Sequence, residues 1–156
     1  MHFITLKETF GKALTIVGKA VPNRPQLPIL SNILLKATDN QLIVSSTNLE
    51  LGIVFTLPVK VEEKGEIAIP GKILTEFISN VHGEKIEFTL VGSQLKLKSG
   101  KTTVTLVTTN PDDFPPFPEV LEFDKKLPFS TFEDAIPRVV SLPLPTKHDL
   151  FSPVYG

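Results

Sequence analysis

Two pairs of side chains in this sequence carry the groups used in acid–base catalysis and metal binding. Asp112 and Asp113 are adjacent, and so are His148 and Asp149 further along the chain. Carboxylates and an imidazole can transfer protons or bind a divalent cation when a fold brings them together. Both pairs lie in segments that contain proline, and neither spacing matches a known ligand pattern. We therefore interpret them as solvated loop residues.

The sequence also lacks the motifs of the common enzyme classes. It has no glycine-rich phosphate loop, no G-x-S-x-G and no H-E-x-x-H. It has no cysteine, which excludes disulfides and thiolate metal sites and suits a reducing compartment. We expect a cytoplasmic protein with no catalytic residues, no metal and no cofactor.

The composition of the 156-residue chain is that of a soluble globular protein, with 41% hydrophobic and 21% charged residues. This length holds one full hydrophobic core and at most a fragment of a second. The formal net charge of −1 argues against a broadly basic surface that grips nucleic acid, because each neutralised phosphate needs a lysine or arginine. The chain has no signal-peptide pattern and nothing close to the ~20 apolar residues that span a bilayer.

The predicted elements of the chain begin with a strand, a helix and three strands. Apolar residues at spacings of three and four predict an amphipathic helix, and they are Phe10, Ala13, Leu14 and Val17. The strands are predicted at 3–6, 29–37, 41–46 and 49–61. Asp39-Asn40 is typical of a tight hairpin turn. The run 49–61 alternates apolar residues with others, as expected for one strand with one buried face.

The same series then occurs a second time. A strand at 65–69 is followed by Pro70 as the first helical residue. The apolar positions of the second helix are Ile73, Leu74, Phe77, Ile78 and Val81. Three strands follow, at 85–90, 94–98 and 102–108. The pattern indicates an internal duplication within one α+β domain, whose two helices lie on one side of a shared antiparallel sheet.

Proline and acidic residues between Asn110 and Val120 stop the last strand and predict an extended linker. Beyond it a third strand-and-helix unit begins, with Ser130 as helix N-cap, Glu133 at the capping-box position and Pro137 inside the helix. We therefore predict a first domain at 1–120 and the beginning of a second at 121–156, so that the sequence is a fragment of a longer chain.

Four stretches match the pattern of a known family. They are RPQLPILSN from Arg24, IPGKIL from Ile69, SGKTTVTLVTTNPDDFP from Ser99 and LPFSTFEDAIPRVV from Leu127. From Met1 to about Val140 the sequence resembles the bacterial sliding clamp, the beta subunit of DNA polymerase III. In that family each domain is a pair of β-α-β-β-β units and three domains make a protomer. Two protomers close head to tail into a ring around duplex DNA, and the helices line the hole.

The resemblance implies a DNA-clamp fold and a non-catalytic processivity factor. It also implies DNA-binding roles for two residues. Arg24 matches the loop arginine that reaches DNA, and Lys72 matches the basic residue that opens the second helix. Contacts from such cations to phosphates carry no base information and permit movement along any sequence. Lys12 and Lys19, on the exposed side of the first helix, are supported only by helical spacing.

The resemblance further implies a protomer interface at the last strand of the domain. Residues 101–106 match the edge strand that pairs with the third domain of a second clamp protomer. The residues concerned are Lys101, Thr103, Val104 and Leu106. An unpaired strand edge presents backbone donors and acceptors that another chain completes. Better-known members place an aromatic residue and arginines nearby, whereas Thr102 and Thr103 leave this interface less charged.

The partners implied are duplex DNA, the replicative polymerase, the clamp loader and the second protomer. The pocket for partner peptides forms mainly between the second and third domains, outside this chain. Two alternatives remain open from the residues themselves. One is a free-standing β-rich module that binds a protein through its edge strand, and the other is a hydrolase that uses the loop carboxylates.

Overall fold

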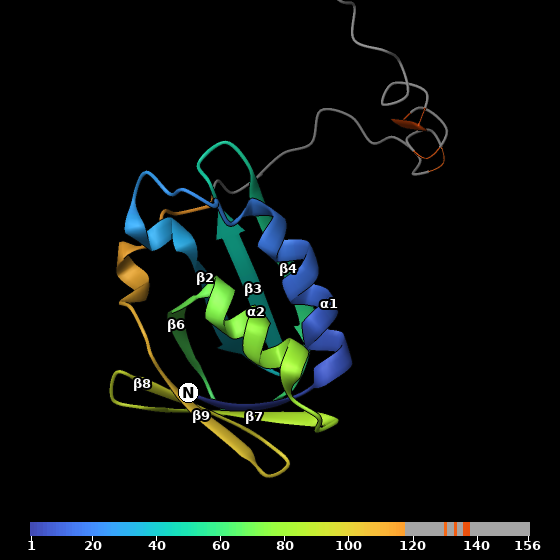
Figure 1. Cartoon of the computed structure of the whole chain (residues 1–156), viewed down its shortest axis with the longest axis vertical. Helices are drawn as coiled ribbons and strands as arrows, with labels where there is room; N and C mark the ends of the chain where they lie inside the picture. Colours follow the sequence, from blue (N-terminus) through green and yellow to red (C-terminus); the bar gives the residue numbers. More distant parts are fainter. Residues whose placement is uncertain (118–129, 131–132, 134–135, 138–156) are drawn as a thin grey trace, which may run out of the picture. The chain divides into compact units, whose positions relative to one another are not determined.

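A computed structural model describes residues 1–117, 130, 133 and 136–137 (Figure 1). The chain divides into two compact units, Met1–Phe117 and Pro118–Gly156. The helices and strands of the first unit are β1 (His2–Leu6), α1 (Lys7–Val17), β2 (Asn32–Thr38), β3 (Gln41–Thr47), β4 (Gly52–Pro58), β5 (Lys60–Glu63), β6 (Gly65–Pro70), α2 (Gly71–Asn80), β7 (Lys85–Val91), β8 (Gln94–Ser99) and β9 (Thr102–Val107). In the second unit, Ser130, Glu133, Ile136 and Pro137 are helical.

The duplicated units exchange their first strands. One sheet has the order β5-β1-β7-β8-β9 and the other has the order β4-β3-β2-β6. β1 therefore pairs with β7 of the second series, while β6 pairs with β2 of the first, and both pairings are antiparallel. The sequence predicted one shared sheet. The structure has two sheets, and each contains the first strand of the other half of the duplication. The duplication itself is confirmed, with β5 as an added edge strand beside β1.

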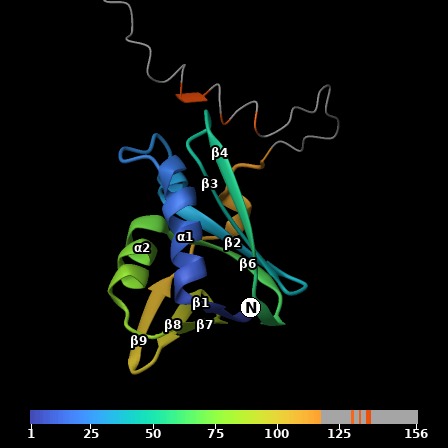
Figure 2. The same cartoon turned by 90° about the vertical axis from the view of Figure 1, so that its right-hand side faces the viewer.

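Both helices lie on the same side of the four-stranded sheet, as predicted. Figures 1 and 2 show α1 and α2 side by side in two perpendicular views. The apolar stripe of α1 is buried at all four predicted positions, and α2 buries Leu74 and Ile78. Lys7 joins the two helices, because its backbone N–H donates to Glu84 O at 2.8 Å and its Nζ donates to Val81 O at 2.5 Å. The opposite faces of both helices remain exposed to solvent.

An aromatic cluster connects the two halves of the duplication. The ring of Phe88 on β7 stacks on Phe3 of β1 with centroids 4.4 Å apart, and meets the edge of Phe10 on α1 at 5.1 Å. All three side chains are fully buried. Rings in these geometries contribute about 0.5–1.5 kcal/mol per pair beyond the burial of their area. The core is thus shared between the halves and not divided between them.

The predicted single strand at 49–61 is wrong. Leu49 lies in a turn with φ of 77°, and the Oδ1 of Asn48 accepts hydrogen bonds from the N–H groups of Glu50 and Leu51. At the other end the ladder stops at Pro58, since proline has no N–H to donate. The run therefore contains a turn and two strands, β4 and β5, that belong to different sheets.

Two other predicted boundaries differ by a few residues. Pro28–Ser31 form a 3-10 turn, in which Leu30 N donates to Leu27 O at 3.0 Å, so β2 begins at Asn32 and not at Ile29. Pro70 has an extended ψ of 113° and pairs with Asn32. It is therefore the last residue of β6 and the N-cap of α2, and the helix begins at Gly71.

The segment predicted as an extended linker is folded onto the first unit as far as it is described. Thr109 bridges to Ala68, and residues 111–113 form a 3-10 turn capped by the Asn110 side chain. Phe114 is 6% exposed and stacks on Phe117 at 6.0 Å. The first unit thus ends in a packed segment, and residues 118–120 lie outside the described part of the chain.

The turn at Leu49 leads to a prediction about stability. A left-handed backbone costs a residue with a Cβ about 1–2 kcal/mol, and asparagine tolerates it better. Leu49 is 56% exposed, so removing its side chain loses little buried area. We expect Leu49→Asn to raise the free energy of unfolding by about 1 kcal/mol in urea denaturation. Leu51→Asn, a change at an exposed leucine without positive φ, is the matched control, and an equal effect of both changes would contradict strain at Leu49.

Candidate nucleic-acid interface

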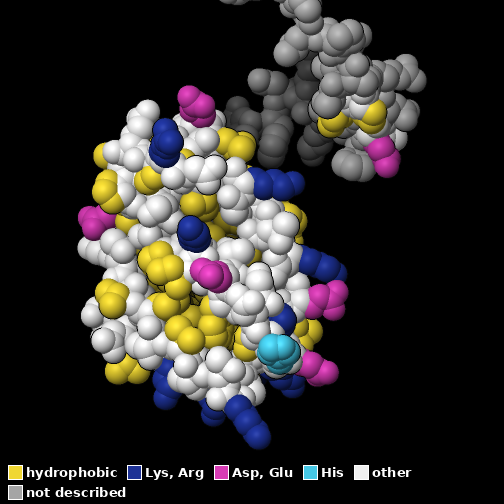
Figure 3. All heavy atoms as spheres, in the orientation of Figure 1, with side chains coloured by type: hydrophobic (Ala, Val, Ile, Leu, Met, Phe, Trp, Pro, Cys, Tyr) yellow, Lys and Arg dark blue, Asp and Glu magenta, His cyan; other side chains and the backbone are white. Residues whose placement is uncertain are grey.

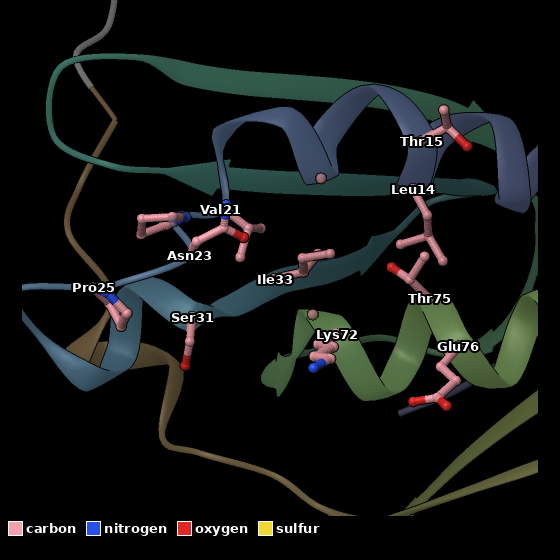
Figure 4. Close-up of a pocket in the computed structure, with 13 residues that line it drawn as sticks. Leu14, Thr15, Val21, Asn23, Pro25, Ser31, Ile33, Lys72, Thr75 and Glu76 are labelled. Carbon is pink, nitrogen blue, oxygen red and sulfur yellow. The ribbon is translucent and has the colours of Figure 1, made fainter.

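An open cavity lies where the two helices meet the loop at 21–25 (Figure 4). Its volume is about 770 Å³. Asn23 and Pro25, which flank Arg24, contribute to its lining, and so do Lys72 and Glu76 of α2. Arg24 and Lys72 are both exposed. The structure therefore brings the loop of Arg24 and the side chain of Lys72 to one cavity, although they are distant in the sequence.

Four lysines of the first unit are paired with carboxylates. On α1, Lys12 Nζ lies 2.7 Å from Glu8 Oε1, and this hydrogen bond and the lysine charge lower the pKa of the Glu8 carboxyl. The other pairs are Lys36–Glu66, Lys60–Glu62 and Lys64–Asp39. Such exposed pairs contribute little to stability, but each reduces the charge that a lysine offers to an external anion.

Three basic residues near the cavity make no ion pair with any residue that the structure describes. They are Lys19, Arg24 and Lys72. Lys72 is the second residue of α2, whose first turn holds no acidic residue. A helix N-terminus carries partial positive charge, so the backbone and the lysine favour anions at the same place. Of the two lysines considered from helical spacing, Lys12 is paired with Glu8. Lys19 lies in the 3-10 turn Gly18–Ala20 after α1 and has no such partner among the described residues.

The predicted interface residues in and next to β9 form an exposed set and a half-buried set. Lys101 belongs to the turn before the strand, and Thr103 is exposed. Val104 and Leu106 are half-buried. Val104 lines a groove of about 280 Å³ between α2 and β9, together with Ile73 and Phe77 of the helix and other residues.

Ile73 and Phe77 line this groove, a role that the sequence did not predict. Both were assigned to the buried stripe of the second helix, yet Ile73 is 48% exposed and Phe77 is only partly buried. The signal was present in the sequence, because α2 has more apolar positions than one sheet-facing stripe requires. An apolar groove therefore runs beside the free edge of the sheet.

Within the described part of the chain the backbone of β9 presents a free edge, since this strand is the last of the five-stranded sheet. Just beyond β9, Thr108 N donates to Ser93 O at 2.9 Å. Hydrogen bonding alternates along an antiparallel pair, so residues of the same parity, such as Val104, also bond to β8. The N–H groups of Thr103 and Thr105 consequently point toward the free edge.

The acidic pairs are not assembled into a site among the described residues. Asp112 and Asp113 are exposed on a 3-10 turn, and His148 and Asp149 lie outside the described residues. Within the described part of the chain, no three histidine, cysteine or carboxylate side chains are placed to hold a metal ion. The helices described there also include none with the length and apolarity to cross a membrane.

Comparison with known proteins identifies relatives for most of the chain. The family model for the DNA polymerase III beta subunit, N-terminal domain, matches residues 1–118. A beta sliding clamp from Pseudomonas aeruginosa is 31% identical over 142 residues, which are 90% of this chain and 38% of that protein. One from Vibrio harveyi is 32% identical over 117 residues, or 74% of this chain and 81% of that sequence. This chain therefore spans well under half of the Pseudomonas relative.

Solved structures show the same fold. The crystal structure of the DNA polymerase III subunit beta from Pseudomonas aeruginosa aligns with a TM-score of 0.73 at 32% identity, covering 76% of this chain and 33% of that chain. The beta subunit from Streptococcus pyogenes aligns with a TM-score of 0.76 at 24% identity, covering 80% of this chain and 34% of that chain. The predicted α+β clamp fold is confirmed. Because the family model extends over the whole first unit, the chain belongs to the DNA polymerase III beta subunit family, and the matched part is its N-terminal domain.

Proposed function

We propose that this chain supplies the first domain of a sliding clamp that encircles duplex DNA and holds a replicative polymerase on its template. The observation that carries the proposal is a set of cations, Arg24 and Lys72 above all, that make no ion pair with a described residue and belong to the loop and the helix that line one cavity. In a closed ring the helix face would meet the DNA phosphates. Residues 1–120 would form clamp domain 1, and residues 121–156 would begin domain 2.

A small number of phosphate contacts suits this function. The logarithm of duplex affinity falls with the logarithm of salt concentration by about 0.9 for each phosphate that a cation neutralises. Two or three contacts therefore hold DNA loosely and do not read its sequence. Retention would come from the closed ring, so the domain can slide without dissociating. The role needs no catalytic residue and no cofactor, and it places the protein in the cytoplasm with the chromosome.

Ring closure would use β9. The free N–H groups of this strand would pair with the third domain of a second protomer. Val104 and Leu106 would supply apolar contact, continued by Ile73 and Phe77 across the groove. Lys101 and Thr103 would lie at the exposed margin of the interface. The polymerase and the clamp loader would bind in the parts of the clamp that this chain does not include.

The DNA contacts can be tested on the chain itself. We expect Arg24→Ala combined with Lys72→Ala to weaken binding to duplexes of unrelated sequence equally, because only phosphate contacts are lost. The salt dependence should also become shallower, by about 0.9 for each contact removed. The measurement is fluorescence anisotropy of a labelled duplex at several salt concentrations. Lys36→Ala, which removes a lysine already paired with Glu66, should change neither quantity. An unchanged salt slope in the double variant would exclude both residues from the DNA interface.

A second candidate function is a β-rich module that binds a protein through its edge strand, which the groove between α2 and β9 favours. A chimaera separates the two functions, with residues 1–117 replacing the first domain of the Pseudomonas aeruginosa relative. A clamp should remain on closed circular DNA and dissociate when the circle is cut. A binding module should show no dependence on whether the circle is closed.

A further inference from the structure

A second group of unpaired cations lies on the outer face of the five-stranded sheet, which points away from the helices. Lys85, Lys96 and Lys98 project outward from β7 and β8, and all three are exposed. None of them makes an ion pair with a residue in the described part of the chain. Figure 3 shows Lys and Arg side chains gathered along the lower edge of the molecule, where Figure 1 places β7, β8 and β9. On β7 and β8 this face therefore carries more basic than acidic side chains, although the chain as a whole does not.

The strand register arranges the outer face in rows. Lys96 lies between Thr89 and Thr105, and Lys98 lies between Glu87 and Thr103. Residues two apart on one strand are separated by about 7 Å, so the two lysines form a regular pair of positive charges. Two carboxylates of this sheet face meet at His2 of β1. Glu87 Oε1 is hydrogen bonded to His2 Nε2 at 2.9 Å, and Glu62 Oε2 of β5 lies 3.0 Å from His2 Nδ1.

The next row along β8 contains two apolar side chains. Val91 and Val107 lie on either side of the exposed Gln94. They are 67% and 69% exposed, more than any other large hydrophobic side chain among the described residues. Two exposed valines beside two unpaired lysines make a surface that is apolar at one end and basic at the other. We call this surface, formed by Lys85, Val91, Lys96, Lys98 and Val107, the outer patch.

We propose that the outer patch binds an acidic protein segment in extended conformation, with one apolar side chain above Gln94, against the two valines, and carboxylates over Lys96 and Lys98. In an extended chain, alternate side chains point the same way and repeat at the spacing of the sheet beneath them. The segment would therefore read apolar-x-acidic-x-acidic. Lys85, further along the same face, would receive an additional acidic group.

The two exposed valines favour a peptide over a nucleic acid. A phosphate backbone gains nothing from exposed valines, and single-stranded nucleic acid is usually held by aromatic rings on which bases stack. The outward residues of β7, β8 and β9 are all described, and none of them is aromatic. The proposal is independent of the clamp function, because it uses neither the helix face nor the free edge of β9.

The test uses the unmodified chain and a labelled synthetic peptide that contains Leu-Ser-Asp-Ser-Asp. We expect saturable binding by fluorescence anisotropy, weakened about tenfold by the combined change Lys96→Glu and Lys98→Glu and several-fold by Val107→Ser. Lys64→Glu, which reverses a charge on an exposed lysine outside the patch, is the matched control and should leave affinity unchanged. All these positions are exposed, and thermal unfolding would verify that each variant keeps its fold.

Two further probes decide what the patch recognises. A peptide of the same composition with the leucine between the aspartates should bind several-fold more weakly, because its apolar side chain no longer meets the valines. Oligothymidine should bind more weakly than the ordered peptide. Tighter binding of oligothymidine that depends on Lys96 and Lys98 would overturn the proposal in favour of a phosphate site. Equal affinity for both peptides, or for the double variant and the unmodified chain, would also overturn it.

Discussion

Replacing Thr103 by proline is expected to abolish pairing through β9 while the domain stays folded. The N–H of Thr103 points to the free edge, so proline removes a donor that only an incoming strand would use. Proline is tolerated in edge strands at such positions. The ring also occupies the space into which a partner strand would dock. A proline change of this kind thus separates assembly from folding.

The measurement is sedimentation of the chimaera with and without the substitution. We expect the dimer to dissociate at concentrations about 100-fold higher in the Thr103→Pro variant, which corresponds to roughly 2.7 kcal/mol of lost pairing. Val104→Pro provides the matched contrast, because the N–H of Val104 bonds to β8 and its loss should destabilise the domain itself. A Thr103→Pro chimaera that dimerises like the parent would show that β9 is not the protomer edge.

The second large effect is expected from Phe88→Ala. This ring contacts Phe3 and Phe10, so it joins β7 to β1 and α1 at the point where the duplicated halves exchange strands. Removing a buried phenylalanine costs about 3–5 kcal/mol in lost transfer energy and cavity formation. Since domains of this size are stable by only about 5–15 kcal/mol, the variant should lose between about a fifth and all of the free energy of unfolding.

Urea denaturation followed by circular dichroism would measure this loss. Val91→Ala, a truncation in the same strand at a side chain that is 67% exposed, should change the free energy of unfolding by less than about 0.5 kcal/mol. A cost below about 1 kcal/mol for Phe88→Ala would contradict a core shared by the two halves.

The sequence predicted what depends on local spacing. The apolar stripe of α1 and the hairpin turn at Asp39-Asn40 are present because helical period and turn chemistry are set within a few residues. The run from Leu49 misled because alternation was counted through residues 49–51, where the Asn48 side chain closes a turn, and through Pro58, which ends a ladder. Alternation alone does not report either event.

Long-range pairing was beyond the sequence pattern. The exchange that pairs β1 with β7 and β6 with β2 joins segments that local periodicity does not relate. For the same reason, the approach of the Arg24 loop to Lys72 could be expected only from the family resemblance. The groove lined by Val104 could not be predicted either, because it includes Ile73, and helical spacing alone places Ile73 in the core.

The central claim is that the helix face, and not the outer sheet, meets DNA inside a closed ring. The chain has no cysteine, so Arg24→Cys and Lys96→Cys each introduce one unique attachment point in residues 1–117 for a photo-crosslinker. In the chimaera, with other cysteines replaced by serine, both variants would be loaded on closed circular duplex and irradiated. The R24C variant should crosslink to DNA, the K96C variant should not, and linearising the circle before irradiation should abolish the signal. Equal crosslinking from both positions, or crosslinking that survives linearisation, would contradict the claim.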